Sequence, residues 1–259
     1  MRHNSLKEIA RELSVSRGTL DRVIHNRGGI SPETTARVQE LVELVDEIAK
    51  SGKPVVTFNN DVISSRRLAH VGSNYRVGGR LAGEVLAKAI KSGAVAVLRR
   101  SSSYFQNRER VTVFTEVIDS YEAIRMAGCF GESTDYDSGY RNMKRLLESV
   151  PDLRGLFMLN NESDIITATC DAISDSGRKP FDVVTLDLPS AVAREITRGR
   201  ITATVCQDPF SQGYDGVKIL FKYLSENVVP TRSIYSTRLD VFYRENLDNY
   251  GFELYRSFF

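Results

Sequence analysis

Short apolar runs, separated by stretches of helix length, recur along most of this chain. They fall at Val55–Phe58, Ala94–Leu98, Gly155–Leu159, Val183–Leu186 and Ile201–Cys206. Strands that are apolar along nearly their whole length are typical of a parallel sheet whose two faces are both covered. Helical stretches are expected between them, near residues 75–91, 108–121, 138–149, 163–177, 190–199 and 210–226. The pattern predicts an α/β fold built on a doubly wound parallel sheet.

The first 50 residues follow a different pattern, that of short amphipathic helices. Apolar residues from Leu6 to Leu13 share one helical face, and Ser5 is placed to cap this helix. A second helix follows Ser16, and a third runs from Ser31 to Ser51 without a break. The spacing predicts an all-α helix-turn-helix head, although a small helical cap with a solvated face fits the periodicity equally well.

Charge distinguishes this head from the rest of the chain. Residues 1–30 carry six basic and three acidic side chains, a net charge of +3, whereas the whole chain has a net charge of +2. The exposed face of the second helix is rich in side chains that reach phosphates and base edges: Arg17, Thr19, Arg22, His25 and Asn26. A basic module on a nearly neutral body is suited to binding a polyanion at one end.

The segment SLKEIARELSVSRGTLDRVIHNRGGISPETTARV resembles the DNA-binding head of the lactose- and galactose-repressor (LacI/GalR) family. The resemblance implies a cytoplasmic transcriptional regulator, commonly a repressor, that binds double-stranded operator DNA as a homodimer. It places base-reading groups at Arg17, Gly18 and Arg22 and phosphate contacts at Ser16, Thr19 and Asn26. The full predicted DNA-binding set is Ser5, Ser16, Arg17, Gly18, Thr19, Arg22, His25 and Asn26. Asp21 replaces the family's usual small hydroxyl residue, so the operator sequence does not carry over.

Polar residues follow several of the predicted strands. Asn59 and Asp61 follow the first strand, Asn160 the third, Asp187 the fourth and Gln207 the fifth. Each alone is more often a turn former or a helix cap. Ligands of open α/β sheets bind at the carboxyl ends of strands, so the convergence of these residues indicates a binding crevice.

The body, from about Gly52 to Asn246, resembles the ribose- and galactose-binding branch of the periplasmic-binding-protein superfamily. The resemblance rests on KPVVTFNND, RERVTVF, LFMLNNE, VVTLDLP and ATVCQDPFSQGY. It implies a sugar or polyol effector, with Phe58 as one candidate for stacking on a sugar face. The predicted effector-binding set is Phe58, Asn59, Asp61, Arg110, Asn160, Asp187 and Gln207. A guanidinium and a carboxylate on opposite sides of a polyol satisfy adjacent hydroxyls, which makes this set chemically reasonable.

The resemblance also fixes the predicted domains. Residues 1–50 form the head and residues 51–259 the effector-binding core. Within the core, the second subdomain covers about 74–207 and 237–246, and a remnant of the first covers about 51–73 and 208–236. The family's hinge and about three βα units, on the order of 80–100 residues, have no counterpart between Glu40 and Lys53. An incomplete first subdomain should expose strand edges and apolar faces. The alternative function is that of a truncated regulator that does not sense a ligand, or of a ligand-binding remnant, with constitutive DNA binding or none.

Other classes of function find less support in the sequence. No run approaches the ~20 apolar residues of a membrane span, and the three histidines are scattered, so neither a membrane partner, a metal site nor a catalytic triad is predicted. Cys129, Cys170 and Cys206 lack the spacing of a metal site and are predicted to be reduced, buried thiols. Gly78 and Gly79, with Gly83, lack the order of a nucleotide-binding loop and are predicted to allow close helix packing. We therefore expect no cofactor and no enzymatic activity.

Overall fold

The computed structural model describes residues 32–99, 105–131, 133, 135–159, 162–178 and 180–250. The predicted helix-turn-helix head up to Ser31, with all eight of its DNA-contacting residues, lies outside these ranges, as does Asn160.

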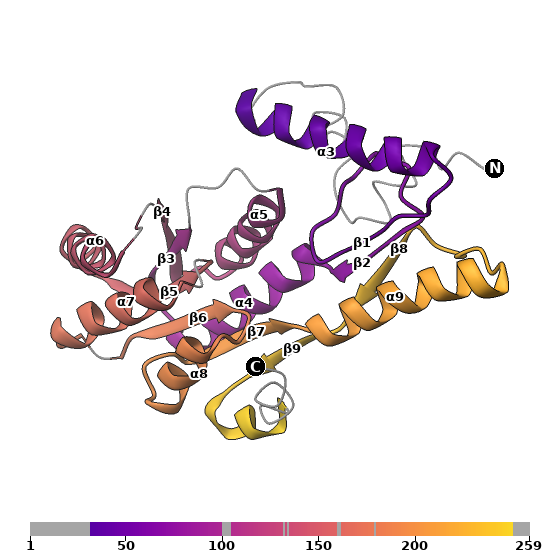
Figure 1. The fold of residues 1–259 in the computed structure, drawn as a ribbon. Coiled ribbons are helices and arrows are strands. Elements are labelled where there is room, and N and C mark those ends of the chain that lie inside the picture. The colour runs from indigo at the N-terminus through magenta and orange to yellow at the C-terminus, as the bar shows by residue number, and fades with distance from the viewer. Residues whose placement is uncertain are drawn as a thin grey trace. The chain divides into compact units, whose positions relative to one another are not determined.

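Helices and strands alternate along the described chain (Figure 1). The helices are α3 (Pro32–Lys50), α4 (Tyr75–Ile90), α5 (Phe105–Asp119), α6 (Tyr136–Ser149), α7 (Ser163–Asp175), α8 (Ser190–Thr197), α9 (Pro209–Glu226) and the 3-10 helix η1 (Arg244–Tyr250). The strands are β1 (Val56–Phe58), β2 (Ala69–Ser73), β3 (Gly93–Arg99), β4 (Ile124–Gly131), β5 (Leu153–Met158), β6 (Asp182–Leu186), β7 (Ala203–Gln207), β8 (Ile234–Thr237) and β9 (Leu239–Phe242).

The predicted elements are present, with small shifts at their ends. Every predicted helix of the body has its counterpart among α4 to α9, and the long helix expected before residue 51 is α3. The fifth predicted strand begins at Ala203, not Ile201, and it includes Gln207 as its last residue. Four strands were not predicted: β2, β4, β8 and β9.

The described chain divides into two compact units. One contains the chain up to Asn74 together with Asp208–Arg238, and the other contains Tyr75–Gln207 together with the chain from Leu239. Each is built around its own sheet.

The larger unit is a six-stranded sheet with helices on both faces. Its strand order is β4-β3-β5-β6-β7-β9, and its strands are parallel except for the antiparallel pair of β7 and β9. Alternate residues of β3 and β5 enter two apolar cores, one with α6, α7 and α8 and the other with α4 and α5 (Figure 1). Burial on both faces explains why these strands are apolar along their length. The predicted α/β class with mainly parallel pairing is confirmed.

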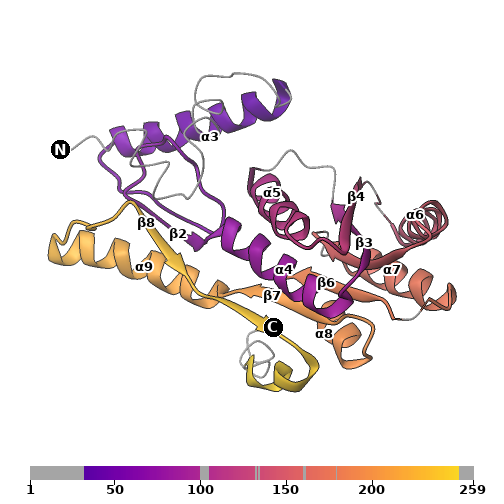
Figure 2. The same ribbon diagram turned by 180° about the vertical axis from the view of Figure 1, so that it is seen from behind.

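The smaller unit has a three-stranded parallel sheet of order β1-β2-β8. Helix α9 packs against β1 and β2, and Figure 2 shows it running alongside this sheet. Helix α3 is less closely packed, because Val45 alone is buried among its described side chains. The Arg66 backbone N–H donates to Asp46 Oδ1 of α3 at 2.6 Å. Leu41 and Leu44 on the same helix are about half exposed.

Candidate functional site

Arg110 occupies its position because two helices approach each other very closely. A Cβ atom added to Gly79 of α4 would lie 2.2 Å from the backbone oxygen of Arg110 in α5. One turn further along, a Cβ at Gly83 would lie 2.9 Å from Val117 Cβ. Close packing was predicted for both glycines and is confirmed, whereas Gly78 has only an ordinary contact at 3.8 Å, with Leu239.

The side chain of Arg110 is buried, with 8% of its surface exposed. Its guanidinium lies over the ring of Tyr75, 4.8 Å from the centroid, which is a favourable cation–π distance. Nη1 also donates to Asn107 Oδ1 at 3.4 Å. Burial lowers the pKa of the guanidinium, and the Asp187 carboxylate and Tyr75 partly offset this effect. The cation is therefore held in place in surroundings that favour interaction with acceptor groups.

Asp187 and Gln207 form a pair at the carboxyl ends of neighbouring strands. Asp187 directly follows β6 and has a left-handed backbone (φ 59°), which an Asp tolerates better than most residues. Its N–H donates to the Val205 carbonyl at 2.9 Å, and its own carbonyl accepts from the Thr204 hydroxyl, so the turn is fixed against β7. Gln207 Nε2 donates to Asp187 Oδ1 at 2.9 Å.

The larger unit thus brings together three of its predicted effector-binding residues: Arg110, Asp187 and Gln207. A guanidinium donates several N–H groups in one plane, a carboxylate accepts on both oxygens, and an amide does both. This combination recognises vicinal hydroxyl groups. Tyr75 joins the cluster without having been predicted. The sequence signal for it is an aromatic residue at the start of a helix that follows a strand.

Phe58 and Asn59 lie at the end of β1 in the smaller unit. Phe58 is 59% exposed, which suits a stacking surface better than a core residue. Asn59 has a left-handed backbone (φ 61°), and its N–H donates to the Val71 carbonyl at 3.0 Å. The chain therefore turns after β1 at Asn59, a residue type that tolerates the left-handed backbone conformation.

Asp61 makes contacts that sequence reasoning did not anticipate. Its carboxylate forms a two-bond ion pair with Arg67, in which Nη2 donates to Oδ2 at 2.6 Å. Thr57 Oγ1 donates to Oδ1 at 3.1 Å, and His70 Nδ1 lies 3.5 Å away. The Asp61 and Arg67 side chains are only 6% and 10% exposed. Asp61 therefore holds together the loop between β1 and β2, in addition to any role at a ligand.

His70 completes this buried network at the centre of β2. Its Nδ1 lies 3.0 Å from Thr57 Oγ1. Burial lowers the pKa of His70, Asp61 opposes that effect, and Arg67 adds to it. The neutral imidazole is therefore the form that the folded unit favours.

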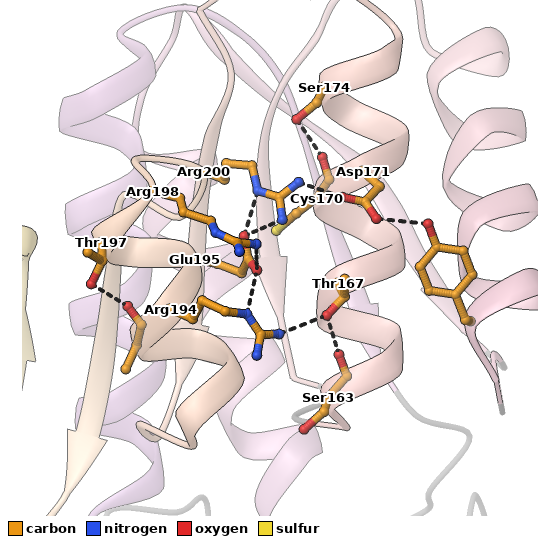
Figure 3. Close-up of polar contacts among 12 residues, drawn as sticks. Ser163, Thr167, Cys170, Asp171, Ser174, Arg194, Glu195, Thr197, Arg198 and Arg200 are labelled. Carbon is orange, nitrogen blue, oxygen red and sulfur yellow. Dashed lines mark hydrogen bonds and ion pairs between the residues drawn. The ribbon is translucent and has the colours of Figure 1, made fainter.

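A second polar cluster lies between α7 and α8 (Figure 3). The fully buried Glu195 carboxylate pairs with three arginines: Arg194, Arg198 and Arg200. Arg200 also pairs with Asp171, which accepts from Tyr136 Oη at 2.8 Å. These charges are matched to one another, so we interpret the cluster as structural.

The predicted state of the cysteines needs one correction. Cys170 and Cys206 are buried, but Cys129 is exposed, because β4 is the edge strand of its sheet. Burial raises the pKa of the Cys170 thiol to about 12.

In the described ranges, no group of three or more His, Cys, Asp or Glu residues is placed to hold a metal ion. No described helix is long and apolar enough to cross a membrane.

Known proteins with this fold share its arrangement of elements. A sugar-binding protein of a sugar ABC transporter from Bacillus halodurans superposes with a TM-score of 0.76 at 23% identity, covering 82% of this chain and 77% of that one. A protein from Bacteroides fragilis described as a LacI transcriptional regulator gives a TM-score of 0.70 at 17% identity, covering 82% and 74%. At these identities the likeness concerns the fold.

Sequence comparison reaches the same group of proteins. The ribose import binding protein of Escherichia coli is 25% identical over 206 residues, which is 78% of this chain and 67% of that protein. Residues 34–227 match the family described as periplasmic binding protein domain, a range that includes most of α3 and ends just after α9. The chain belongs to the periplasmic binding protein domain family.

Proposed function

We propose that this protein is a cytoplasmic, DNA-binding transcriptional regulator whose periplasmic-binding-protein domain binds a sugar or related polyol. The observation that carries the sugar-binding part is the buried Arg110 guanidinium, held by Tyr75 close to the Asp187–Gln207 pair. Family membership and the printed activity of the ribose import binding protein support the same ligand class.

Three features of the cluster favour a polyol over an inorganic anion. Arg110 supplies positive charge, but Asp187 places a carboxylate in the same region, which would repel a phosphate or sulfate. Gln207 adds an amide that both donates and accepts. Tyr75 covers one face of the guanidinium and leaves its N–H edge as the direction for hydrogen bonds. A neutral ligand with adjacent hydroxyls satisfies all these groups.

The DNA-binding part rests on the sequence of residues 5–26. Arg17 and Arg22, in the predicted second helix, would provide forks that match the acceptor edge of guanine, and each bidentate contact is worth roughly 1–3 kcal/mol of discrimination. Ser16 and Thr19 are suited to phosphate contacts, which set the position of the helix on DNA. The fold similarity to the Bacteroides fragilis protein described as a LacI transcriptional regulator is compatible with this role.

Calorimetric titration with a panel of pentoses, hexoses and inositols tests the sugar site. We expect one member to bind the wild-type protein and to bind Arg110→Lys at least ~10-fold more weakly, because lysine cannot form the planar two-bond contact. Arg80→Lys makes the same change at an exposed arginine of α4 and should bind normally. No binding by the wild type, or equal loss in both variants, would rule out Arg110 as a ligand-binding residue.

Selection from a random double-stranded DNA library tests the regulator. We expect a palindromic sequence to be enriched, since a dimeric head reads two half-sites. Arg22→Ala should lower affinity for that sequence much more than for random DNA. A sugar that binds should change operator affinity, and the operator should change sugar affinity by the same factor. Unchanged affinities of Arg22→Ala for both DNAs would reject the recognition helix.

One competing function has a specific observation in its favour. Several curated relatives are named as ribose import binding proteins, so a binding protein without a DNA role is the second candidate. Sugar binding with no enrichment of any DNA sequence would select this candidate. DNA binding that no sugar alters would instead select a regulator whose body does not sense.

A further inference from the structure

Helix α9 buries one side and exposes a row of apolar residues on another. Its buried side, with Gln212 and Gly216, faces the smaller unit's own sheet. The α9 stripe, by which we mean Phe210, Tyr214, Val217, Phe221 and Leu224, is 56–68% exposed. At 3.6 residues per turn, the stripe is centred roughly 140° from the buried side. A helix that serves only to cover a sheet would have polar residues there.

The spacing of the stripe is that of a helix–helix seam. Its members are alternately four and three residues apart, the a/d repeat by which one helix packs along another. They extend over about 21 Å of helix. The Phe210 and Tyr214 rings already stack, with centroids 6.0 Å apart, and Lys218 Nζ lies 5.4 Å from the Tyr214 ring. Side chains that are ordered in advance lose less entropy on binding.

The stripe is complementary to itself. In an antiparallel pair of α9 helices centred on Val217, Phe210 lies opposite Leu224 of the second copy, and Tyr214 lies opposite its Phe221. The small Val217 at the centre allows the helices to approach closely. The five side chains offer on the order of 500–600 Å² per protomer, and the adjoining rim would bring the interface near the ~800 Å² per partner of a stable complex. The largest apolar patch on a typical monomer covers about 300–600 Å² and is often functional.

We propose that the α9 stripe is a self-association surface, through which two copies of this chain form a twofold dimer by antiparallel packing of their α9 helices. The proposal requires neither sugar nor DNA to bind. It therefore stands or falls separately from the proposed function.

Light scattering after size-exclusion chromatography tests the proposal on the full chain. We expect the wild type to approach twice the 29.0 kDa chain mass at concentrations rising from ~1 to ~100 µM. Val217→Glu should raise the dissociation constant at least ~100-fold, because each dimer would bury two unpaired carboxylates at its centre. Val229→Glu is the matched control: Val229 is 66% exposed against 68% for Val217, and it lies beyond the end of the helix. This variant should remain dimeric.

Cross-linking tests the geometry in case Val217→Glu does not fold. In a Cys129→Ser background, which removes the exposed native thiol, Val217→Cys should form a disulfide-linked dimer under mild oxidation. Val229→Cys should not. A monomeric wild type at ~100 µM, equal association of the two glutamate variants, or equal cross-linking of the two cysteine variants would overturn the proposal.

Discussion

Gly79→Ala is the substitution whose effect can be worked out most directly from the structure. The added methyl group would lie 2.2 Å from the Arg110 carbonyl oxygen and 2.9 Å from that residue's Cα and carbonyl carbon. Carbon and oxygen atoms normally stay more than 3 Å apart. All three contacts are to backbone, so no side chain can rotate away, and α4 and α5 must separate by about 1 Å.

The expected cost is larger than the gain in helix propensity. Overpacking of this kind costs about 1–3 kcal/mol and occasionally more, whereas alanine stabilises a helix by about 1 kcal/mol relative to glycine. Because the clash is with backbone along a buried seam, we expect Gly79→Ala to lower the free energy of unfolding by about 2 kcal/mol. Gly78→Ala is the matched control, since its Cβ would meet only Leu239 at an ordinary 3.8 Å. That variant should be stabilised by about 0.5–1 kcal/mol.

Urea denaturation followed by circular dichroism measures both changes. The free energies of unfolding of the two variants should differ by about 3 kcal/mol, which appears as separated midpoints at similar slopes. Gly79→Ala should also weaken sugar binding, because separating the helices moves the Arg110 guanidinium away from Asp187. Equal stabilities for the two variants would refute the close approach of α4 and α5, and with it our account of how Arg110 is positioned.

Three further predictions follow from buried groups. The folded pKa of His70 lies below its unfolded value of about 6.5, so its contribution to stability is complete above pH 6.5 and is lost progressively as pH falls from there through the folded pKa. Between pH 7.5 and 5.5, wild type should therefore lose more unfolding free energy than His70→Gln in thermal or urea melts. A thiol reagent at pH 8 should modify Cys129 in the folded protein, although partial burial raises the pKa of its thiol, and should modify Cys170 only after unfolding, as peptide mass mapping would show. Arg200→Ala should lower the free energy of unfolding by about 2 kcal/mol, because the buried Glu195 carboxylate would keep only Arg194 and Arg198, whose side chains are more exposed. A change below about 0.5 kcal/mol would contradict the role of the Arg200–Glu195 ion pair.

The sheet of the larger unit could be predicted because its inner strands are buried on both faces. The unpredicted strands lack that signal. In β2, His70 and Ser73 interrupt the apolar pattern, although every residue of the strand is buried. The edge strand β4 has only one buried residue, Ile124, and contains two glycines. Short strands such as β8 and β9 gain their order from neighbours that are distant in sequence.

The candidate site was predictable to the extent that strand ends define it. Asp187 and Gln207 follow from the rule that ligands bind at the carboxyl ends of parallel strands. Arg110 lies within a helix, where no local pattern separates a binding arginine from a solvated one, so only the family resemblance identified it. Tyr75 carries a weak sequence signal, but its contact with Arg110 exists only when α4 and α5 are packed together. The Asp61–Arg67 pair was missed because residues six apart in an irregular loop follow no periodicity.

The two units differ in how completely the apolar side chains of their helices are buried. In the larger unit, helices cover both faces of six strands, and apolar side chains fill both cores. In the smaller unit, three strands are packed against α9, while α3 leaves Leu41 and Leu44 half exposed and α9 carries its stripe outward. A sheet this small gains little stability on its own, so further burial is expected to come from outside the unit. A twofold contact through α9 would supply that burial. The self-association proposed for α9 therefore predicts that these apolar residues become buried when two copies of the chain associate.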